Sequence, residues 1–177
     1  GHAVVVSGGI ASTGAARLAA RGALRAGAGL VTIASPREAL VVNASASLAV
    51  MVGEADGAEG LKALLGDSRI NAVVLGPGGG VGPEMRRKVE ISLAGKRTVI
   101  LDADALTSFG DNPKELFTIQ SNHPQSTAIH TPHEGEFARI FRSIEKVYEV
   151  KQKLEVCLSA SHETAGIVVL KGADTVV

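Results

Sequence analysis

The stretch that decides the fold is residues 72–83, AVVLGPGGGVGP. Its first four residues, Ala72–Leu75, form a short continuous apolar run, which is typical of a strand that is covered on both faces. Residues 76–82 then supply a glycine-rich loop, and Pro83 fits the first position of a helix that runs to about Ala94. Parallel sheets are built from strands that pass through a loop into a helix. This stretch therefore predicts an α/β fold.

The same alternation of strand and helix recurs along the chain. Strands are predicted at residues 3–7, 30–34, 98–101, 127–130 and 166–170, with a shorter one at 50–52. Helices are predicted at residues 14–26, 61–65, 134–141 and 144–159, with a helical turn at 104–109, a mixture of turn and short helix at 36–48 and a loop at 53–60. Right-handed crossovers between such units produce a mostly parallel sheet with helices on both faces.

One domain over residues 1–177 is the simplest organisation, because no internal repeat or linker is visible. The last predicted strand, with Lys171 directly after it, is followed only by residues 172–177, whereas an edge strand or a terminal helix would normally follow. We therefore expect residues 1–177 to be a fragment of the domain that is incomplete at its C-terminus.

Composition excludes several classes of protein. Of the 177 residues, 45% are hydrophobic and 20% are charged, which predicts a globular domain. The net charge is zero and no long basic run occurs, so nothing favours binding to nucleic acid or to an anionic membrane. No apolar stretch approaches the ~20 residues of a membrane span. Because Cys157 is the only cysteine and no signal peptide is visible, we expect a cytoplasmic protein.

The predicted helix at residues 14–26 has two distinct sides. Arg17, Arg21 and Arg25 recur every four residues and share one stripe. The side that we expect to face the sheet carries small and apolar residues: Ala15, Leu18, Ala19 and Gly22. Small side chains on this side would let the helix lie close to the sheet.

Five of the predicted strands are each followed by a motif whose residues could bind a ligand or take part in catalysis. The motifs occupy residues 12–16 (STGAA), 75–80 (LGPGGG), 101–106 (LDADAL), 131–137 (TPHEGEF) and 170–175 (LKGADT). Ligands of open α/β sheets bind at the carboxyl ends of strands, where backbone amides and helix N-termini are exposed. The five motifs therefore predict one composite active-site rim.

The first two motifs can bind a ligand through their backbone. The loop at residues 76–82 could cradle a phosphate or the polar edge of a nucleotide, or it could be a tight connecting turn. No Gly-Lys-Ser/Thr follows it, so it is not a P-loop. Ser12 or Thr13 is a plausible helix cap. The amides of Gly14 and Ala15 could then face a ligand, although capping and close packing alone would explain this motif.

The two aspartates of the third motif, Asp102 and Asp104, are two residues apart at a strand exit. Both carboxylates would point the same way if the strand continued, and they could hold Mg²⁺ through water. In the alternative interpretation, Asp104 caps the following turn and Asp102 pairs locally.

The last two motifs also have a functional and a structural interpretation. His133 could donate a hydrogen bond to a ligand or act in acid–base chemistry, although a single histidine is more often structural. Glu134 and Glu136 in the first helical turn suit the helix dipole. Lys171 could reach a phosphate while Gly172 lets the backbone approach a base or ribose, but the same segment could be an ordinary hairpin turn.

Taken together and in this order, the five motifs resemble the ADP- or ATP-dependent NAD(P)H-hydrate dehydratases, carbohydrate-kinase-like enzymes of the ribokinase-like superfamily. The resemblance covers nearly the whole chain and extends to TGAARLAA at residues 13–20 and RAGAGLVT at residues 25–32. It implies a ribokinase-like three-layer sandwich with a mostly parallel central sheet. It also implies the repair of hydrated NADH or NADPH: a nucleotide phosphoryl group makes the ring hydroxyl a leaving group, and elimination restores the cofactor.

The resemblance also implies roles for individual residues. The hydrated dinucleotide would contact Ala15, Gly78, Gly80 and His133. The nucleotide, ADP or ATP, would contact Lys171, Gly172, Ala173, Asp174 and Thr175, with Asp102 and Asp104 as accessory residues. Mg²⁺ would bridge the nucleotide phosphates. Homo-oligomers are expected from the same likeness.

The chain departs from the family pattern at one important point. The family carries a Gly-Ser/Thr-Gly-Asp segment whose glycines form an anion hole and whose aspartate is the expected base. That segment should follow Lys171-Gly172, and residues 1–177 do not contain it. The catalytic base is therefore expected beyond Val177, and we expect residues 1–177 alone to be inactive. Two smaller departures are His133-Glu134-Gly135, where the family often has proline before the glycine, and a poor match at residues 143–164.

Two other functions remain as alternatives. One is a small-molecule kinase of the same superfamily, of the hydroxyethylthiazole- or sugar-kinase type, which would share the nucleotide site. The other is a non-catalytic nucleotide-binding module. A Rossmann dehydrogenase is disfavoured, because no Gly-x-Gly-x-x-Gly with a downstream acid follows the first strand.

Overall fold

The computed structural model describes residues 1–143 and 152–177. Its centre is a seven-stranded sheet in the order β3-β2-β1-β4-β5-β6-β7. The strands are β1 (His2–Val6), β2 (Leu30–Ser35), β3 (Met51–Glu54), β4 (Ile70–Leu75), β5 (Thr98–Leu101), β6 (Thr127–His130) and β7 (Ile167–Val168). Every pairing between these strands is parallel, which confirms the predicted α/β class.

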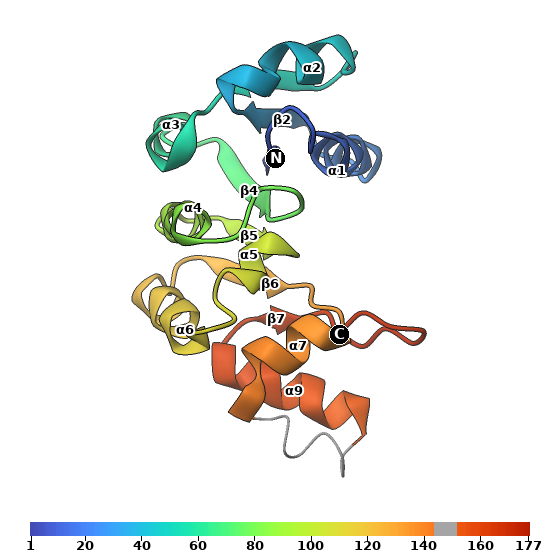
Figure 1. The fold of residues 1–177 in the computed structure, drawn as a ribbon, viewed down its shortest axis with the longest axis vertical. Coiled ribbons are helices and arrows are strands. Elements are labelled where there is room, and N and C mark those ends of the chain that lie inside the picture. The colour runs from blue at the N-terminus through green and yellow to red at the C-terminus, as the bar shows by residue number, and fades with distance from the viewer. Residues whose placement is uncertain (144–151) are drawn as a thin grey trace.

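Helices cover both faces of the sheet and complete three layers. They are α1 (Gly14–Arg25), α2 (Leu40–Ser45, after a 3₁₀ turn at Arg37–Ala39), α3 (Gly57–Leu64), α4 (Pro83–Leu93), α5 (Asp104–Thr107), α6 (Pro113–Asn122), α7 (Glu134–Ile140) and α9 (Lys153–Thr164). In Figure 1 the strands are stacked along the long axis of the molecule, with α1 on one side of the sheet and α3, α4 and α6 on the other.

The strand order reverses direction between β1 and β4. The chain runs outward from β1 to β3, returns through α3 to β4 beside β1, and then continues to β7 on the other side. Ligands of doubly wound sheets bind at such a reversal, outside the carboxyl ends of the strands. The loops that follow β1 and β4 both emerge at this point. The topology of the sheet therefore predicts that these two loops contact the ligand.

Two predicted connections differ from the structure. Residues 53–60 do not form a loop, because Gly53 and Glu54 extend β3 and α3 already begins at Gly57. The carboxylate of Glu84 accepts the Ala58 N–H at 2.6 Å and so supports the first turn of α3 from a distant helix, which local sequence cannot reveal. Helix α6 has no counterpart in the prediction, although Pro113 at its start is a recognisable signal.

Other boundaries agree to within a few residues or lie partly outside the described chain. The predicted helix at 144–159 begins outside the described residues, and α9 occupies its second half and continues to Thr164. The predicted strand at 166–170 is reduced to β7, because a hairpin begins at Leu170.

The predicted orientation of α1 was wrong for three of the four residues named, and only Ala19 of these packs against the core. Ala16 and Ala20 face the sheet and are buried, whereas Leu18 is 73% exposed. Ala15 and Gly22 are also exposed. The principle of small residues against the sheet holds, but the buried stripe is shifted by about one residue from the predicted one.

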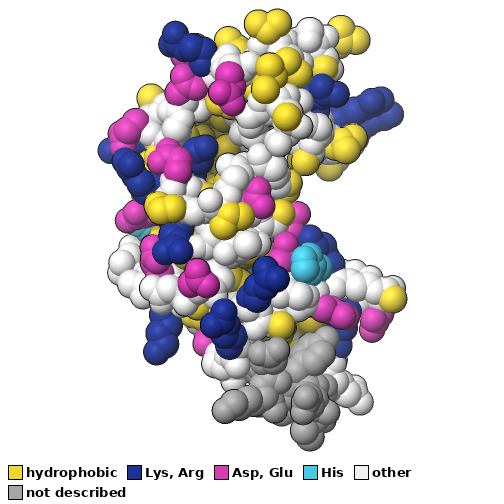
Figure 2. All heavy atoms as spheres, in the orientation of Figure 1, with side chains coloured by type: hydrophobic (Ala, Val, Ile, Leu, Met, Phe, Trp, Pro, Cys, Tyr) yellow, Lys and Arg dark blue, Asp and Glu magenta, His cyan; other side chains and the backbone are white. Residues whose placement is uncertain are grey.

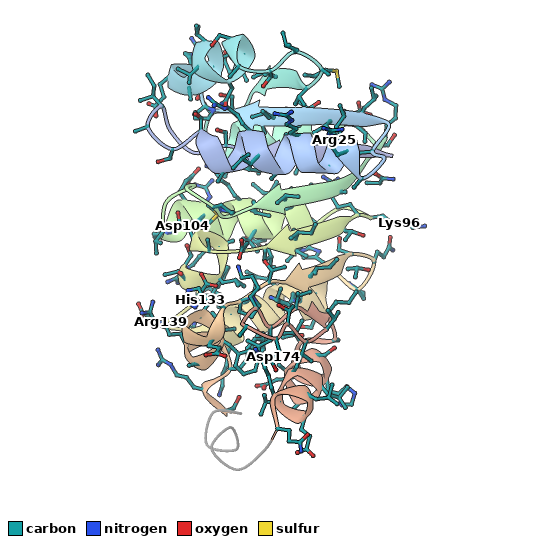
Figure 3. All side chains as sticks on the ribbon, turned by 90° about the vertical axis from the view of Figure 1, so that its right-hand side faces the viewer. Arg25, Lys96, Asp104, His133, Arg139 and Asp174 are labelled. Atoms are coloured by element: carbon teal, nitrogen blue, oxygen red, sulfur yellow. The ribbon has the colours of Figure 1, made fainter. Side chains whose placement is uncertain are left out.

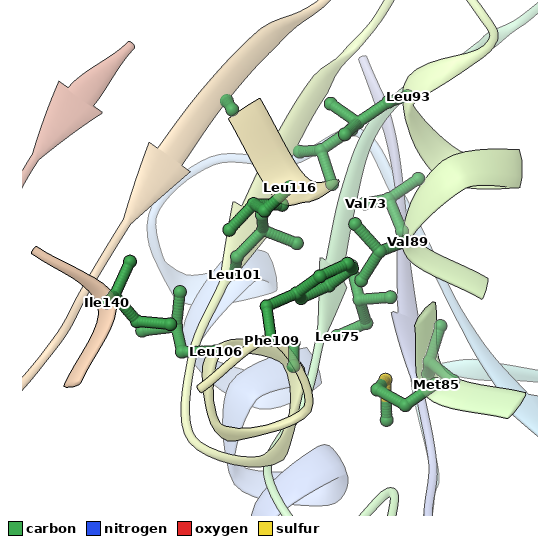
Figure 4. Packing of buried hydrophobic residues seen from close by; sticks show 14 of the residues in the cluster. Val73, Leu75, Met85, Val89, Leu93, Leu101, Leu106, Phe109, Leu116 and Ile140 are labelled. Carbon is green, nitrogen blue, oxygen red and sulfur yellow. The ribbon is translucent and has the colours of Figure 1, made fainter. Parts of the chain in front are cut away.

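The main core lies on the face covered by α3, α4, α6 and α9. Figure 4 shows its centre, where the Phe109 ring lies among leucine and valine side chains from β4, β5 and α4. A smaller cluster lies under α1 on the opposite face. On that second face Ile100, Ile129 and Ile167 are aligned across three strands, and Ile167 remains 41% exposed. No helix among the described residues combines the length and the apolar character that a membrane crossing requires.

His130, at the end of β6, is a fully buried titratable group in the main core. Its side chain is 0% exposed, and its Nε2 lies 2.9 Å from Nε2 of Gln120. Burial penalises the imidazolium and lowers the pKa of His130 to about 4, from 6.5 in solution. The unfolded chain therefore binds more protons than the folded protein between these two pH values.

We expect the free energy of unfolding to fall as the pH is lowered from 6.5 toward 4. His130 alone should contribute about 3 kcal/mol over this window, since each pKa unit corresponds to about 1.4 kcal/mol. Urea unfolding at several pH values should show this slope, and a His130→Phe variant should show a smaller one. Equal slopes in the two proteins would show that His130 is not the group responsible.

Candidate active site

All five motifs meet at the carboxyl edge of the sheet. The glycine loop after β4 packs against the turn after β1 so closely that a Cβ on Gly8 would overlap the carbonyl oxygen of Gly78. On its other side the loop touches the LDADAL segment, and a Cβ on Gly76 would overlap the carbonyl oxygen of Asp102. The glycines at these two positions are thus required by close backbone packing, whatever their role toward a ligand.

The LDADAL segment joins the glycine loop to the C-terminal motif. Asp104 Oδ2 accepts the Gly80 N–H at 2.9 Å. Lys171 Nζ donates to Asp102 Oδ1 at 2.6 Å, although the two residues are 69 positions apart. The side chains of Asp102 and Lys171 are 27% and 41% exposed, so the pair is partly shielded from water. The predicted composite rim is therefore continuous from β1 to β7.

The two aspartates do not point the same way. Strand β5 ends at Leu101, and Ala103 turns the chain with φ +45° and ψ −116°. The two carboxylates therefore diverge toward opposite neighbours. The structural alternative was also wrong, because Asp104 does not cap the following turn and Asp102 pairs with a residue distant in sequence.

The N-terminus of α1 is open at the rim. Thr13 occupies the capping position, but its side chain makes no capping hydrogen bond, so the predicted side-chain cap was wrong. Gly14 and Ala15 are exposed, and a Cβ on Gly14 would meet nothing within 4 Å. Backbone amides at such a helix start attract anions and other hydrogen-bond acceptors.

His133 is the cap of α7. Its Nδ1 accepts the N–H of Gly135 at 3.0 Å and that of Glu136 at 3.3 Å, and Glu136 Oε2 accepts the His133 N–H at 2.9 Å. This reciprocal arrangement is a capping box. Because Nδ1 is an acceptor, the neutral ring carries its proton on Nε2. The side chain is 61% exposed, so that N–H can reach a ligand, and Glu136 Oε1 lies 3.4 Å from Nε2.

The last motif forms a hairpin that is tied to the segment directly before α7. Leu170 and Val176 pair as an antiparallel bridge, which confirms the hairpin interpretation of the backbone, and the Lys171 N–H donates to the Pro132 oxygen at 2.9 Å. Lys153 of α9, which was not singled out from the sequence, donates from Nζ to the backbone carbonyl oxygen of Asp174 at 2.5 Å. No motif surrounds Lys153, so only the tertiary structure reveals this contact.

The views of the whole molecule place the rim on one edge. Figure 3 shows Asp104 and His133 at one end of the strands and Lys96 at the other. Figure 2 shows the molecule hollowed on the side of α1 and the C-terminal hairpin. A separate cavity of about 500 Å³ lies between α1 and residues 46–50 and is lined by the three arginines of α1; it reaches the rim only at Gly14.

Comparison with known proteins decides the family. A family model described as NAD(P)H-hydrate dehydratase matches residues 3–177. The chain belongs to this family.

Curated relatives of this dehydratase-family chain agree with the assignment. The chain is 30% identical over 178 residues to the bifunctional NAD(P)H-hydrate repair enzyme of Coxiella burnetii, with 100% of the chain and 34% of the relative covered. It is 33% identical over 181 residues to the enzyme of the same description from Synechocystis, covering 100% of the chain and 33% of the relative. The chain thus spans about a third of the length of these relatives.

Solved structures show the same fold. A ribokinase-like superfamily protein from Enterococcus faecalis superposes with a TM-score of 0.74 at 22% identity, covering 99% of the chain and 58% of that protein. The ADP/ATP-dependent NAD(P)H-hydrate dehydratase of Bacillus subtilis, co-crystallised with ATP and Mg²⁺, superposes with a TM-score of 0.72 at 24% identity, covering 99% and 59%. The predicted ribokinase-like three-layer fold is therefore confirmed.

The described residues of this dehydratase-family chain do not form a protein-only metal site. No three His, Cys, Asp or Glu side chains among residues 1–143 and 152–177 converge as metal ligands. Asp102 and Asp104 are engaged by Lys171 and Gly80. Mg²⁺ commonly keeps several waters and binds through one or two carboxylates together with substrate phosphates. Mg²⁺ at the rim would therefore need oxygens of a nucleotide and of water as further ligands. Each aspartate keeps one carboxylate oxygen outside its present hydrogen bond, Oδ2 of Asp102 and Oδ1 of Asp104, so either could touch such an ion without leaving its partner.

Proposed function

We propose that the protein carries out the nucleotide-dependent dehydration of hydrated NADH or NADPH. The observation that carries this proposal is the continuous rim, in which the loops expected to hold the dinucleotide are joined to the C-terminal hairpin through the Asp102–Lys171 pair. Membership of the dehydratase family supports the choice of reaction. The rim offers amides, a histidine N–H and a lysine at neighbouring strand ends, which suits a substrate and a phosphoryl donor side by side.

The reaction would proceed in two stages. First, the terminal phosphoryl group of ADP or ATP would pass to the oxygen of the ring hydroxyl, whose proton leaves to a base. Second, the carbon–oxygen bond would break with loss of a ring proton, which releases phosphate and restores the dihydronicotinamide. No residue among 1–177 matches the expected catalytic aspartate, so we assign the base to none of them.

The described residues would share the remaining work. The exposed amides of Gly14 and Ala15, the glycine loop and the Nε2–H of His133 would hold and orient the dinucleotide. The hairpin of Lys171–Thr175 would hold the nucleotide, with the Lys171 ammonium group offsetting phosphate charge. Mg²⁺, when bound with the nucleotide, supplies further neutralisation of that charge. The ATP and Mg²⁺ of the Bacillus subtilis structure support this choice of cofactors.

The test is recovery of absorbance at 340 nm from hydrated NADH. The full-length gene product would be incubated with ADP or ATP and Mg²⁺, beside a control without nucleotide. Nucleotide-dependent recovery with release of phosphate supports the dehydratase. A stable phosphorylated product of another acceptor would instead identify a small-molecule kinase of the same superfamily, and nucleotide binding without turnover of any acceptor would identify a binding module.

Two further properties are proposed with the function. We propose a homo-oligomer, which light scattering of the full-length product would detect. We also propose a cytoplasmic location, which fractionation of the source cells would test.

Substitution of His133 should separate its role as the cap of α7 from its proposed role as a hydrogen-bond donor to the dinucleotide. His133→Asn keeps a capping oxygen at the start of α7 but removes the imidazole N–H. We expect this variant to fold normally, to bind NADH about tenfold more weakly because one hydrogen bond is lost, and to bind ADP unchanged. His133→Ala should lose in addition about 1 kcal/mol of stability with the cap. Calorimetric titration of both ligands checks this, and an equal loss of NADH and ADP affinity would contradict the role assigned to His133.

A further inference from the structure

The shape of the glycine loop depends on one short turn, α5. Asp104 Oδ2 accepts the Gly80 N–H at 2.9 Å, and Ser108 Oγ accepts the Gly82 N–H at 3.1 Å. Ser108 Oγ in turn donates to the Asp104 carbonyl oxygen at 2.6 Å. Asp104 and Ser108 are four residues apart and thus lie on the same side of a helical turn. Together they hold two alternate amides of the loop.

The loop needs such an external support. Four of its residues have positive φ: Gly76, Gly78, Gly80 and Gly82. Glycine chains lose the most conformational freedom on ordering. The loop's own backbone contributes the hydrogen bond from the Gly79 N–H to the Gly76 oxygen, which closes only its first half. The second half, residues 80–82, is held by the side chains of Asp104 in α5 and of Ser108 directly after it.

The carboxylate of Asp104 also determines which kind of ligand group can bind beside Gly80. The Gly80 amide already donates to a carboxylate, so a phosphate oxygen cannot take it without displacing Asp104. The two anions would also repel each other. Asp102 differs, because its charge is offset by Lys171, whereas Asp104 forms no ion pair among the described residues. The half-buried carboxylate of Asp104 has a second oxygen that can accept a further hydrogen bond.

We propose that Asp104 is a positioning residue for the glycine loop and that the ligand group beside Gly80 is a hydrogen-bond donor. On the proposed function, on which this second part rests, that donor is a ribose hydroxyl or the carboxamide N–H of the dinucleotide. Phosphates lie instead toward Lys171. The first part concerns the ligand-free protein and depends on geometry alone.

Amide hydrogen exchange tests the positioning role in the ligand-free, full-length protein. Asp104→Ala should increase the exchange rate of the amides of Gly76 and residues 78–82 about tenfold, because a charge-assisted hydrogen bond is lost. Asp104→Asn keeps an acceptor oxygen and should remain within about threefold of the wild-type rate, since the neutral bond is weaker. The matched control is Asp111→Ala, which removes an exposed aspartate between α5 and α6 and should leave the loop unchanged. Unchanged exchange in Asp104→Ala would overturn the positioning role.

Binding of NADH tests the nature of the ligand group, because the two possibilities predict opposite signs. If a donor sits beside Asp104, Asp104→Ala should weaken NADH binding about tenfold and Asp104→Asn much less. If a phosphate sits there, removal of the negative charge should tighten binding in both variants, which would overturn the proposal. A loss as large in Asp104→Asn as in Asp104→Ala would also overturn it, since the charge itself, as for a metal ligand, would then be required.

The outcomes separate this inference from the proposed function. Failure of the wild-type protein to bind NADH or to restore hydrated NADH would count against the proposed function and the choice of ligand group. The exchange result would still decide the positioning role. Circular dichroism of each variant shows whether it is folded. Ser108→Ala is a second, independent test of the support, because it removes the hydrogen bond to the Gly82 N–H.

Discussion

Gly76→Ala is expected to lower the free energy of unfolding by about 4 kcal/mol, combining backbone strain with a steric overlap. Gly76 has φ +128°, a conformation that residues with a Cβ rarely adopt. The added methyl group would also overlap the carbonyl oxygen of Asp102, which is backbone and cannot simply rotate away. Urea unfolding of the full-length protein measures the loss.

Gly27→Ala is the matched control for this substitution. Gly27 has a similar positive φ of +101°, but a Cβ there would meet nothing within 4 Å. It should therefore show only the backbone strain, about 1–3 kcal/mol. Equal losses at the two positions would mean that the close packing between the glycine loop and Asp102 adds nothing. A larger loss at Gly76 would show that β4 and β5 exits are locked together through this contact.

Lys171→Ala is expected to raise the dissociation constant for ADP about 100-fold. Removing one partner of a buried, hydrogen-bonded charge pair typically costs 2–5 kcal/mol in binding, and Lys171, which is 41% exposed, belongs at the lower end of this range. Every 1.4 kcal/mol corresponds to a factor of ten. The loss has two sources: the ammonium group no longer faces phosphate, and the carboxylate of Asp102, 2.6 Å away in the wild type, is left to repel it. Calorimetric titration with ADP gives the constant directly.

A double variant and a control variant test this prediction further. In a protein that also carries Asp102→Asn, the effect of Lys171→Ala should be several-fold smaller, because the repelling charge is gone. Lys96→Ala removes an exposed lysine at the opposite end of the strands, as Figure 3 shows, and should leave ADP binding unchanged. An unchanged constant in Lys171→Ala would reduce the C-terminal motif to a hairpin that binds no nucleotide.

Local sequence was enough to predict the class of fold and the location of the rim. Strands and helices announce themselves through apolar runs, glycines and prolines within a few residues, as residues 72–83 do. Parallel sheets align the carboxyl ends of their strands, so motifs at strand exits had to gather at one edge. That the motifs touch is confirmed, and the binding roles of Ala15, Gly78, Gly80, His133 and Lys171–Thr175 stay predictions.

Only the tertiary structure decided which side chains meet. Asp102 and Asp104 look alike in sequence, yet one pairs with Lys171 and the other with the Gly80 amide, because the strand ends at Leu101 and its neighbours are β4 and β6. The sheet-facing side of α1 depended on how that helix rolls onto β1 and β2. Local preferences extend over a few residues, whereas these contacts depend on strand order and crossovers, which in this rim join residues 69 positions apart, Asp102 and Lys171, and 70 positions apart, Gly8 and Gly78.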